Sequence, residues 1–192
     1  MDSFATLTAP AVRAAVLVNK ALTMTWLGVA DVYQGTEVTR TSLVDPDNRR
    51  PVDYHSDSGL RPALARLDSG GRPRCLDDDK LVVTSRLARL RAQRPEAFVG
   101  PRSGYRAVPV TTPLAFAFSR LLDGEPEVVV IAQRLTRQLE SLGGWRQESV
   151  VLPQGQWVDV LSGRSMPGGV QALATVMAQA PVVVLAREHG GA

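Results

Sequence analysis

The sequence predicts an α/β segment followed by an all-β segment, and the two meet near Ser103 and Gly104. Two observations support this division. Before Gly100 the apolar residues recur at helical spacing, with one short strand-like run between the helices. After Gly100 the apolar residues follow a period of two, and turn residues separate the runs. We therefore expect one domain over residues 1–102 and an antiparallel β domain, a sandwich or a curled sheet, over residues 103–192.

Composition narrows the class of protein. Of the 192 residues, 44% are apolar and 21% are charged, which is typical of a folded soluble protein. The net charge of +3 is small and the basic residues are scattered, so we expect no nucleic-acid partner. Cys75 is the only cysteine, which excludes an internal disulfide and a cysteine metal cluster. Arg13 and Lys20 interrupt the most apolar segment, Val12 to Leu27, so the sequence predicts no signal peptide, no membrane span and a cytoplasmic location.

The first expected element is an amphipathic helix that has Pro10 in its first turn and ends at Gly28. Its apolar residues at helical spacing are Val12, Ala15, Val16, Leu22 and Trp26. This apolar face is too broad for an isolated surface helix, so another element must cover it. Val29 to Gln34 is then predicted as a short strand that leads into a polar loop reaching Asp53. Because α/β folds carry their chemistry in loops at the carboxyl ends of strands, this loop is the candidate site.

A second long helix is expected between the acidic residues 77–79 and Pro95, after a looser stretch with a helical turn around Leu60 to Leu67. Its acidic start and arginine-rich end agree with the helix dipole. Its buried stripe consists of Val83, Leu87 and Leu90. We expect it to pack beside the first helix, on the outside of the same sheet.

The β domain is predicted from alternation and from apolar runs. Leu114, Phe116 and Phe118 alternate with Ala115, Ala117 and Ser119. Further runs span Val128 to Ala132, Val150 to Leu152, Trp157 to Leu161 and Pro181 to Ala186. Trp145 and Trp157 have β-domain spacing, which favours core positions over a carbohydrate platform.

The polar loop carries groups that suit a polyhydroxylated ligand. The ring of Tyr33 can pack on a pyranose, and the amide of Gln34 can donate to and accept from hydroxyls; an ordinary strand end is the alternative. Arg49 and Arg50 offer charge-assisted donors to sugar hydroxyls. The alternative for the two arginines is salt bridges that hold the loop in shape, with Asp45, Asp47 and Asp53 as partners.

Two further positions have open roles. Asp47 and Asn48 fit a turn after Pro46 as well as a ligand contact. Lys80 lies at a helix start, where its charge opposes the dipole, so a site role is an alternative to a structural one. The complete set of candidate binding residues is Tyr33, Gln34, Glu37, Asp45, Asn48, Arg49, Arg50 and Lys80.

Several strings in the chain have a family likeness. ADVYQGTE, which ends at Glu37, resembles the eighth-strand segment of the α-amylase superfamily barrel (glycoside hydrolase family 13). LVDPDNRRPVDY, which ends at Tyr54, resembles a signature of its maltooligosyl trehalose synthase branch. The resemblance continues through LARLRAQRPEAF, GGW, GQWVDVLSGR and PVVVLA, from about Phe4 to Ala186. It departs from the family where LGVAD replaces the usual PGVPD, with Leu27 and Ala30 in place of prolines.

The resemblance implies a fold and a reaction. The fold is the last part of a (β/α)8 barrel, comprising helix 7, strand 8, loop 8 and helix 8, followed by a C-terminal antiparallel β-sandwich domain. The reaction converts the reducing-end α-1,4 bond of a maltooligosaccharide to the α,α-1,1 bond of a trehalosyl end, by a retaining double displacement on carboxylates. The family places a lysine at the position of Lys80.

The family's catalytic carboxylates lie on the fourth, fifth and seventh strands, and no residue of this chain matches them. A complete barrel needs about 250 residues, whereas roughly 100 precede the β domain here. We therefore expect no catalytic residue, no metal and no cofactor in this chain, and no activity without the missing N-terminal barrel portion. We also expect an exposed apolar patch, with self-association or poor solubility.

The expected role is that of a C-terminal fragment of such a synthase, which binds linear α-1,4-glucans. Two alternatives stay open. One is a non-catalytic α-glucan-binding or barrel-completing module. The other is part of another α-amylase-superfamily hydrolase, against which the LVDPDNRRPVD string argues.

Overall fold

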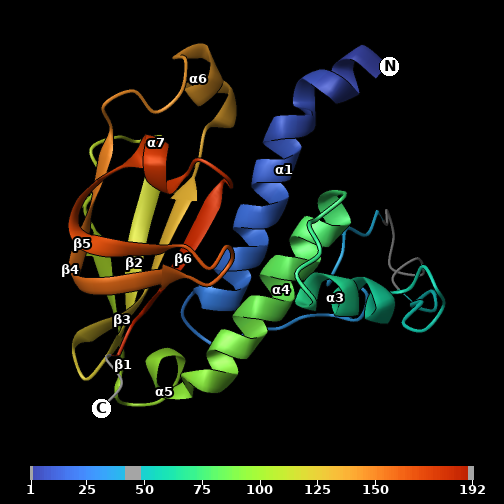
Figure 1. Cartoon of the computed structure of the whole chain (residues 1–192), viewed down its shortest axis with the longest axis horizontal. Helices are drawn as coiled ribbons and strands as arrows, with labels where there is room; N and C mark the ends of the chain where they lie inside the picture. The colour runs from blue at the N-terminus through green and yellow to red at the C-terminus, as the bar shows by residue number, and fades with distance from the viewer. Residues whose placement is uncertain (1, 42–48, 190–192) are drawn as a thin grey trace.

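The computed structural model describes residues 2–41 and 49–189 and shows a curled antiparallel sheet with long helices along one face (Figure 1). The first half is helical: α1 (Asp2–Thr25), α3 (Leu60–Asp68), α4 (Leu76–Gln93) and α5 (Pro95–Phe98). The second half contains β1 (Ser103–Val108), β2 (Ala115–Leu122), β3 (Glu125–Gln133), α6 (Thr136–Ser141), β4 (Ser149–Asp159), β5 (Ser165–Ala172), α7 (Leu173–Val176) and β6 (Val182–Arg187). The predicted change from helices to strands is confirmed. The domain boundary between residues 102 and 103 falls between α5 and β1 and stays a prediction.

The strands form one six-stranded sheet in the order β1-β2-β3-β6-β4-β5, and all neighbours are antiparallel. A bridge between Val110 and Val150 joins the segment after β1 to β4, so the sheet curls back on itself. The register of β4 against β5 shifts between Leu152 and Gln156, and such a bulge bends a strand. The two packed sheets of a β-sandwich are therefore not confirmed, because bending lets a single sheet cover its own inner face. The apolar runs predicted at Val150 to Leu152 and Trp157 to Leu161 both contribute to β4, which ends at Asp159.

The two faces of the sheet bury two separate cores. Side chains alternate between faces along a strand. In β3, Val128 and Val130 face the helices, whereas Val129 and Ile131 face the concave side closed by β4, α6 and α7. This double burial explains why β3 and β6 are continuous apolar runs. Trp145 and Trp157 belong to the concave-side core, as predicted.

The long helices pack together and against the sheet. Leu17 and Ala21 of α1 share a core with Val83 and Leu87 of α4, which confirms that the two helices lie side by side. The sheet that they cover is the antiparallel one formed by β3 and β6. Helix α1 starts at Asp2, so the prediction of Pro10 in the first turn was wrong and Pro10 lies inside the helix. No helix in the described part of the chain is long and apolar enough to span a bilayer.

The barrel part of the predicted fold is not confirmed. Val29 to Gln34 forms no strand in this structure, although the flanking helices exist. The physical reason is that a strand has no internal hydrogen bonds, and no neighbouring strand lies beside this segment in the sheet. The segment is therefore an irregular connection between α1 and the polar loop.

Candidate functional site

The segment after α1 runs past α4 toward α3 (Figure 1). Gly28 has a φ of 95°, a left-handed conformation that suits glycine and turns the chain away from the helix. A tight turn follows, in which the amide of Thr36 donates to the carbonyl of Tyr33 at 2.9 Å. This turn presents the side chains of Tyr33 and Gln34 to solvent, and Tyr33 is 52% exposed.

The next residues are fastened to the start of α4. Nζ of Lys80 donates to the carbonyl of Val38 at 2.7 Å. The amide of Thr39 donates to Oδ1 of Asp77 at 2.8 Å, and the hydroxyl of Thr39 donates to the same oxygen. Asp77 lies in the first turn of α4, where a negative charge also complements the helix dipole. The loop is thus held by side chains of one helical turn.

Two lysines, Lys20 and Lys80, and the carboxylates of Asp31, Glu37 and Asp77 gather at this junction. Burial lowers the pKa of Lys20 on α1, and the nearby Glu37 and Asp31 partly offset it. Burial and then the like charge of Lys20 lower the pKa of Lys80, while Asp77 and Glu37 oppose the shift. Oε2 of Glu37 is buried and accepts no hydrogen bond from any described residue. An unsatisfied buried oxygen beside two ammonium groups is an arrangement suited to a polar ligand.

Arg40 ties the two ends of the polar loop together. Its Nη1 donates to the carbonyl of Gln34 at 3.4 Å, and its Nη2 donates to the carbonyl of Arg50 at 3.0 Å. The side chains of Arg49 and Arg50 are exposed. The candidates Asp45 and Asn48, with Asp47, lie outside the described residues.

The side chain of Asp53 accepts hydrogen bonds that hold the backbone of the following turn. Its Oδ1 accepts the amides of His55 at 3.2 Å and Ser56 at 3.0 Å, and its Oδ2 accepts the Ser56 hydroxyl. These hydrogen bonds from Ser56 lower the pKa of the Asp53 carboxyl. A cavity of about 420 Å³ lies beside Asp53, Arg40 and Asp77, but it is lined by none of the candidate residues that the structure describes.

The structure therefore brings Glu37 and Lys80 together and leaves Tyr33, Gln34, Arg49 and Arg50 on the exposed loop. Sequence reasoning missed Lys20 as part of this group. The sequence shows only that Lys20 stands between the apolar residues Leu17 and Ala21, and the structure leaves it 8% exposed. Arg40 and Asp77, which hold the loop, were also missed.

Most other acidic groups in the described part have structural partners. The pairs are Asp68 with Arg89, Asp78 with Arg66, Asp79 with Arg13, Asp123 with Arg102, and Glu127 with Arg94. Within residues 2–41 and 49–189, no cluster of His, Cys, Asp and Glu could hold a metal ion.

Comparisons with known proteins place this arrangement in context. No protein-family model matches the chain. Two curated proteins from strains of Mycobacterium tuberculosis, provisionally named maltooligosyl trehalose synthase, are each 37% identical over 173 residues. That alignment covers 90% of this chain and 20% of the relative, so the chain spans about a fifth of the curated relatives' length.

Solved structures of trehalose-forming synthases also match this chain over about a fifth of their length. Maltooligosyltrehalose synthase from Arthrobacter ramosus matches with a TM-score of 0.80 and 34% identity, over 92% of this chain and 22% of that protein. A glycosyltrehalose synthase from strain DSM5389 matches with a TM-score of 0.66 and 24% identity, over 97% of this chain and 22% of that protein, which supports the fold alone.

Proposed function

Because this chain resembles the C-terminal portion of maltooligosyl trehalose synthase along nine tenths of its length, we propose that it forms one wall of a glucan-binding cleft in a trehalose-forming enzyme. The substrate class is the linear α-1,4-glucan, a maltooligosaccharide. The reaction of the whole enzyme is an intramolecular glucosyl transfer, an isomerisation that moves the reducing-end bond from α-1,4 to α,α-1,1.

The observation that best supports this proposal is the buried Oε2 of Glu37. This oxygen has no hydrogen-bond partner in the described structure and lies near Lys20 and Lys80. A sugar hydroxyl can donate to this oxygen and accept from an ammonium group, so a glucosyl unit satisfies both signs of charge at once. Leaving such a buried acceptor unsatisfied costs about 1–3 kcal/mol, and ligand binding recovers part of that cost.

The exposed loop extends the same wall. The ring of Tyr33 offers an apolar face to a pyranose, and the amide of Gln34 offers a donor and an acceptor. Arg49 and Arg50 add charge-assisted donors. Asp45 and Asn48 complete the proposed binding set.

The reacting carboxylates come from elsewhere in this proposal. A retaining glycoside transfer needs two carboxyl groups about 5–5.5 Å apart across the bond. The acidic side chains around the candidate loop instead hold structure: Asp53 binds Ser56, and Asp77 binds Thr39. The remaining barrel portion is therefore the proposed partner, and the chain alone is inactive.

Maltopentaose titration by calorimetry tests the binding role. Glu37→Gln replaces a carboxylate by an amide of the same size and should weaken binding roughly tenfold, the loss of one charge-assisted hydrogen bond. Glu188→Gln is the matched control, because Glu188 is exposed and uses only its backbone amide in a contact. Equal affinity of the two variants would contradict the proposed site.

A product assay tests the catalytic half of the proposal. Maltopentaose incubated with the purified chain should give no trehalosyl-ended product and no glucose. Turnover by the chain alone would show that it contains its own reacting groups, and glucose release without trehalosyl ends would favour a hydrolase.

One observation favours a second candidate function, a barrel-completing module. Val29 is 90% exposed, and Tyr33 in the same segment is 52% exposed. Isolated exposed apolar residues are ordinary, but these belong to one segment that has a strand pattern and no strand partner. Trehalosyl-forming activity that appears only after a carboxylate-bearing barrel portion is mixed with this chain would support that role.

A further inference from the structure

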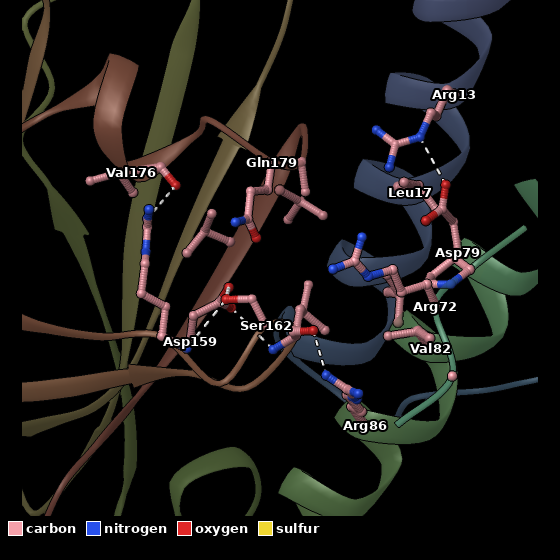
Figure 2. A pocket seen from close by; sticks show the side chains of 18 residues that line it. Arg13, Leu17, Arg72, Asp79, Val82, Arg86, Asp159, Ser162, Val176 and Gln179 are labelled. Atoms are coloured by element: carbon pink, nitrogen blue, oxygen red, sulfur yellow. Dashed lines mark hydrogen bonds and ion pairs between the residues drawn. The ribbon is translucent and has the colours of Figure 1, made fainter. Parts of the chain in front are cut away.

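A cleft of about 820 Å³ lies between the helices and the sheet (Figure 2). Helices α1 and α4 and the turn after α3 form one side, and the loops after β4 and α7 form the other. A volume of roughly 300–1,000 Å³ is usual for small-molecule sites. The cleft shares no lining residue with the candidate glucan site.

The lining of this cleft is positively charged. It contains four guanidinium groups, from Arg13, Arg72, Arg86 and Arg164, and two carboxylates, from Asp79 and Asp159. At neutral pH the fully ionised lining would carry two net positive charges. No lysine or glutamate contributes.

Both carboxylates of the lining have partners within the protein. Asp79 is held by Nε of Arg13 at 2.8 Å. Asp159 is 5% exposed and turned toward its own loop, where it accepts the amide of Leu161 at 3.1 Å and the hydroxyl of Ser162. Both acids are thus already hydrogen-bonded within the protein.

Several donors in the cleft have no hydrogen-bond partner among the described residues. The guanidinium of Arg72 is exposed and makes no hydrogen bond or ion pair with any described residue. Arg13 uses only Nε, so both of its terminal nitrogens are available among the described contacts. Figure 2 shows Arg13, Arg72 and Gln179 extending toward the space between the helices and the sheet.

The other two arginines shape the cleft rather than fill it. Arg86 donates to the carbonyl of Leu161, which joins α4 to the loop after β4. Arg164 donates to the carbonyls of Thr175 and Val176, both at 2.9 Å. Their charges still add to the positive potential, while their hydrogen bonds fix the walls.

One wall of the cleft is apolar. It is formed by Leu17, Val82, Val83, Val176, Val182 and Val183. A ligand that suits the cleft therefore combines an anionic group with an uncharged organic body. The forked donors of arginine match phosphate oxygens two at a time, which makes phosphate the best-fitting anion.

We propose that this cleft binds the phosphate ester of a small organic molecule, with the phosphate between Arg72 and the terminal nitrogens of Arg13. The ester's organic part lies along the apolar wall. The amide of Gln179 supplies a further hydrogen bond.

Calorimetric titration of the full chain at low ionic strength tests this assignment with three probes: glucose 6-phosphate, inorganic phosphate and glucose. Glucose 6-phosphate should bind more tightly than inorganic phosphate, because it also contacts the apolar wall. Glucose should not bind at the same concentrations. Raising the salt concentration should weaken the binding of both phosphates.

Variants locate the site. Arg72→Ala should weaken glucose 6-phosphate binding roughly tenfold, the loss of one charge-assisted contact, and should leave the thermal midpoint unchanged because Arg72 has no described partner. Arg134→Ala is the matched control: Arg134 is exposed, lies outside the cleft lining and makes no side-chain hydrogen bond or ion pair with the described residues. It should bind like the unmodified chain.

Four results would overturn the proposal. They are absence of phosphate binding, equal binding of glucose and glucose 6-phosphate, equal losses in the two arginine variants, and inorganic phosphate binding as tightly as the ester. The last result would reject the organic part of the assignment. None of them bears on maltopentaose binding, so this proposal and the glucan site fail separately.

Discussion

Replacing Asp77 by alanine should detach the candidate loop from α4. Oδ1 of Asp77 accepts two hydrogen bonds from Thr39, one from the amide at 2.8 Å and one from the hydroxyl. Hydrogen bonds to a charged group contribute about 1.5–3 kcal/mol each, and the half-buried position of Asp77 favours the lower end. Its place in the first turn of α4 adds about 0.5 kcal/mol through the helix dipole. We expect Asp77→Ala to lower the free energy of unfolding by about 3.5 kcal/mol.

Urea unfolding followed by circular dichroism measures this effect, and two companion variants divide it. Thr39→Val removes only the hydroxyl and should cost about 1.5 kcal/mol. The double variant should cost little more than Asp77→Ala alone, because the hydroxyl has then already lost its acceptor, which gives a coupling of about 1.5 kcal/mol.

Asp57→Ala is the matched control for this experiment. Asp57 is exposed and has no side-chain hydrogen bond in the described structure, so its replacement should change stability by less than about 0.5 kcal/mol. Additive costs for the Asp77 and Thr39 variants, or an Asp77→Ala cost no larger than that of Asp57→Ala, would refute the reasoning.

Two further predictions concern the β domain. Burial raises the pKa of the Asp159 carboxyl, although hydrogen bonds from Ser162, Leu161 and Val184 partly offset the rise. The folded state therefore binds the carboxyl proton of Asp159 more tightly than the unfolded state does. The proton's contribution to the free energy of unfolding is present below the unfolded pKa and is lost as the pH rises through the folded pKa. In urea unfolding across the acidic range, Asp159→Asn should lose less stability with rising pH than the unmodified chain. Gly168→Ala would place a Cβ 2.3 Å from the carbonyl oxygen of Pro153. This substitution should lower the free energy of unfolding by roughly 2 kcal/mol, again measured by urea unfolding. In Gly124→Ala the new Cβ meets no atom within 4 Å, so this variant tests the glycine backbone effect alone.

The sequence predicts those elements of the fold that local pattern determines. Helix α4 follows from its acidic first turn and its apolar stripe, and β3 follows from its continuous apolar run. The edge strands β1 and β5 were missed. The sequence of β5 contains Pro167, Gly168 and Gly169, and half of its residues are exposed, so neither composition nor alternation marks it as a strand. Its pairing with β4 supplies the hydrogen bonds that the local sequence does not encode.

The candidate site was predictable only where it coincides with a motif. Glu37 was found because it lies in a string with a family likeness, and Lys80 because the family places a lysine at its position. Lys20 was not found, because its proximity to Glu37 depends on how α1 packs against α4 and on the path of the connecting segment. Arg72 was missed for a similar reason, since its cleft is formed by elements from both halves of the chain. Electrostatic neighbours that are distant in sequence leave no periodic pattern to detect.

The segment after α1 has the alternating burial of a strand but forms no strand. Burial alternates along it, with Val29, Asp31 and Tyr33 exposed, and Ala30 and Val32 partly buried against the core of the helices. That period of two is the side-chain arrangement of an extended strand with one covered face. What is absent from the described structure is a neighbour to complete the backbone ladder, and an extended segment without a neighbour gains no ladder hydrogen bonds. The direction of each side chain depends on local alternation, whereas the hydrogen bonding depends on other strands. If the proposed barrel portion provides those strands, the same residues can pair without changing which face is covered.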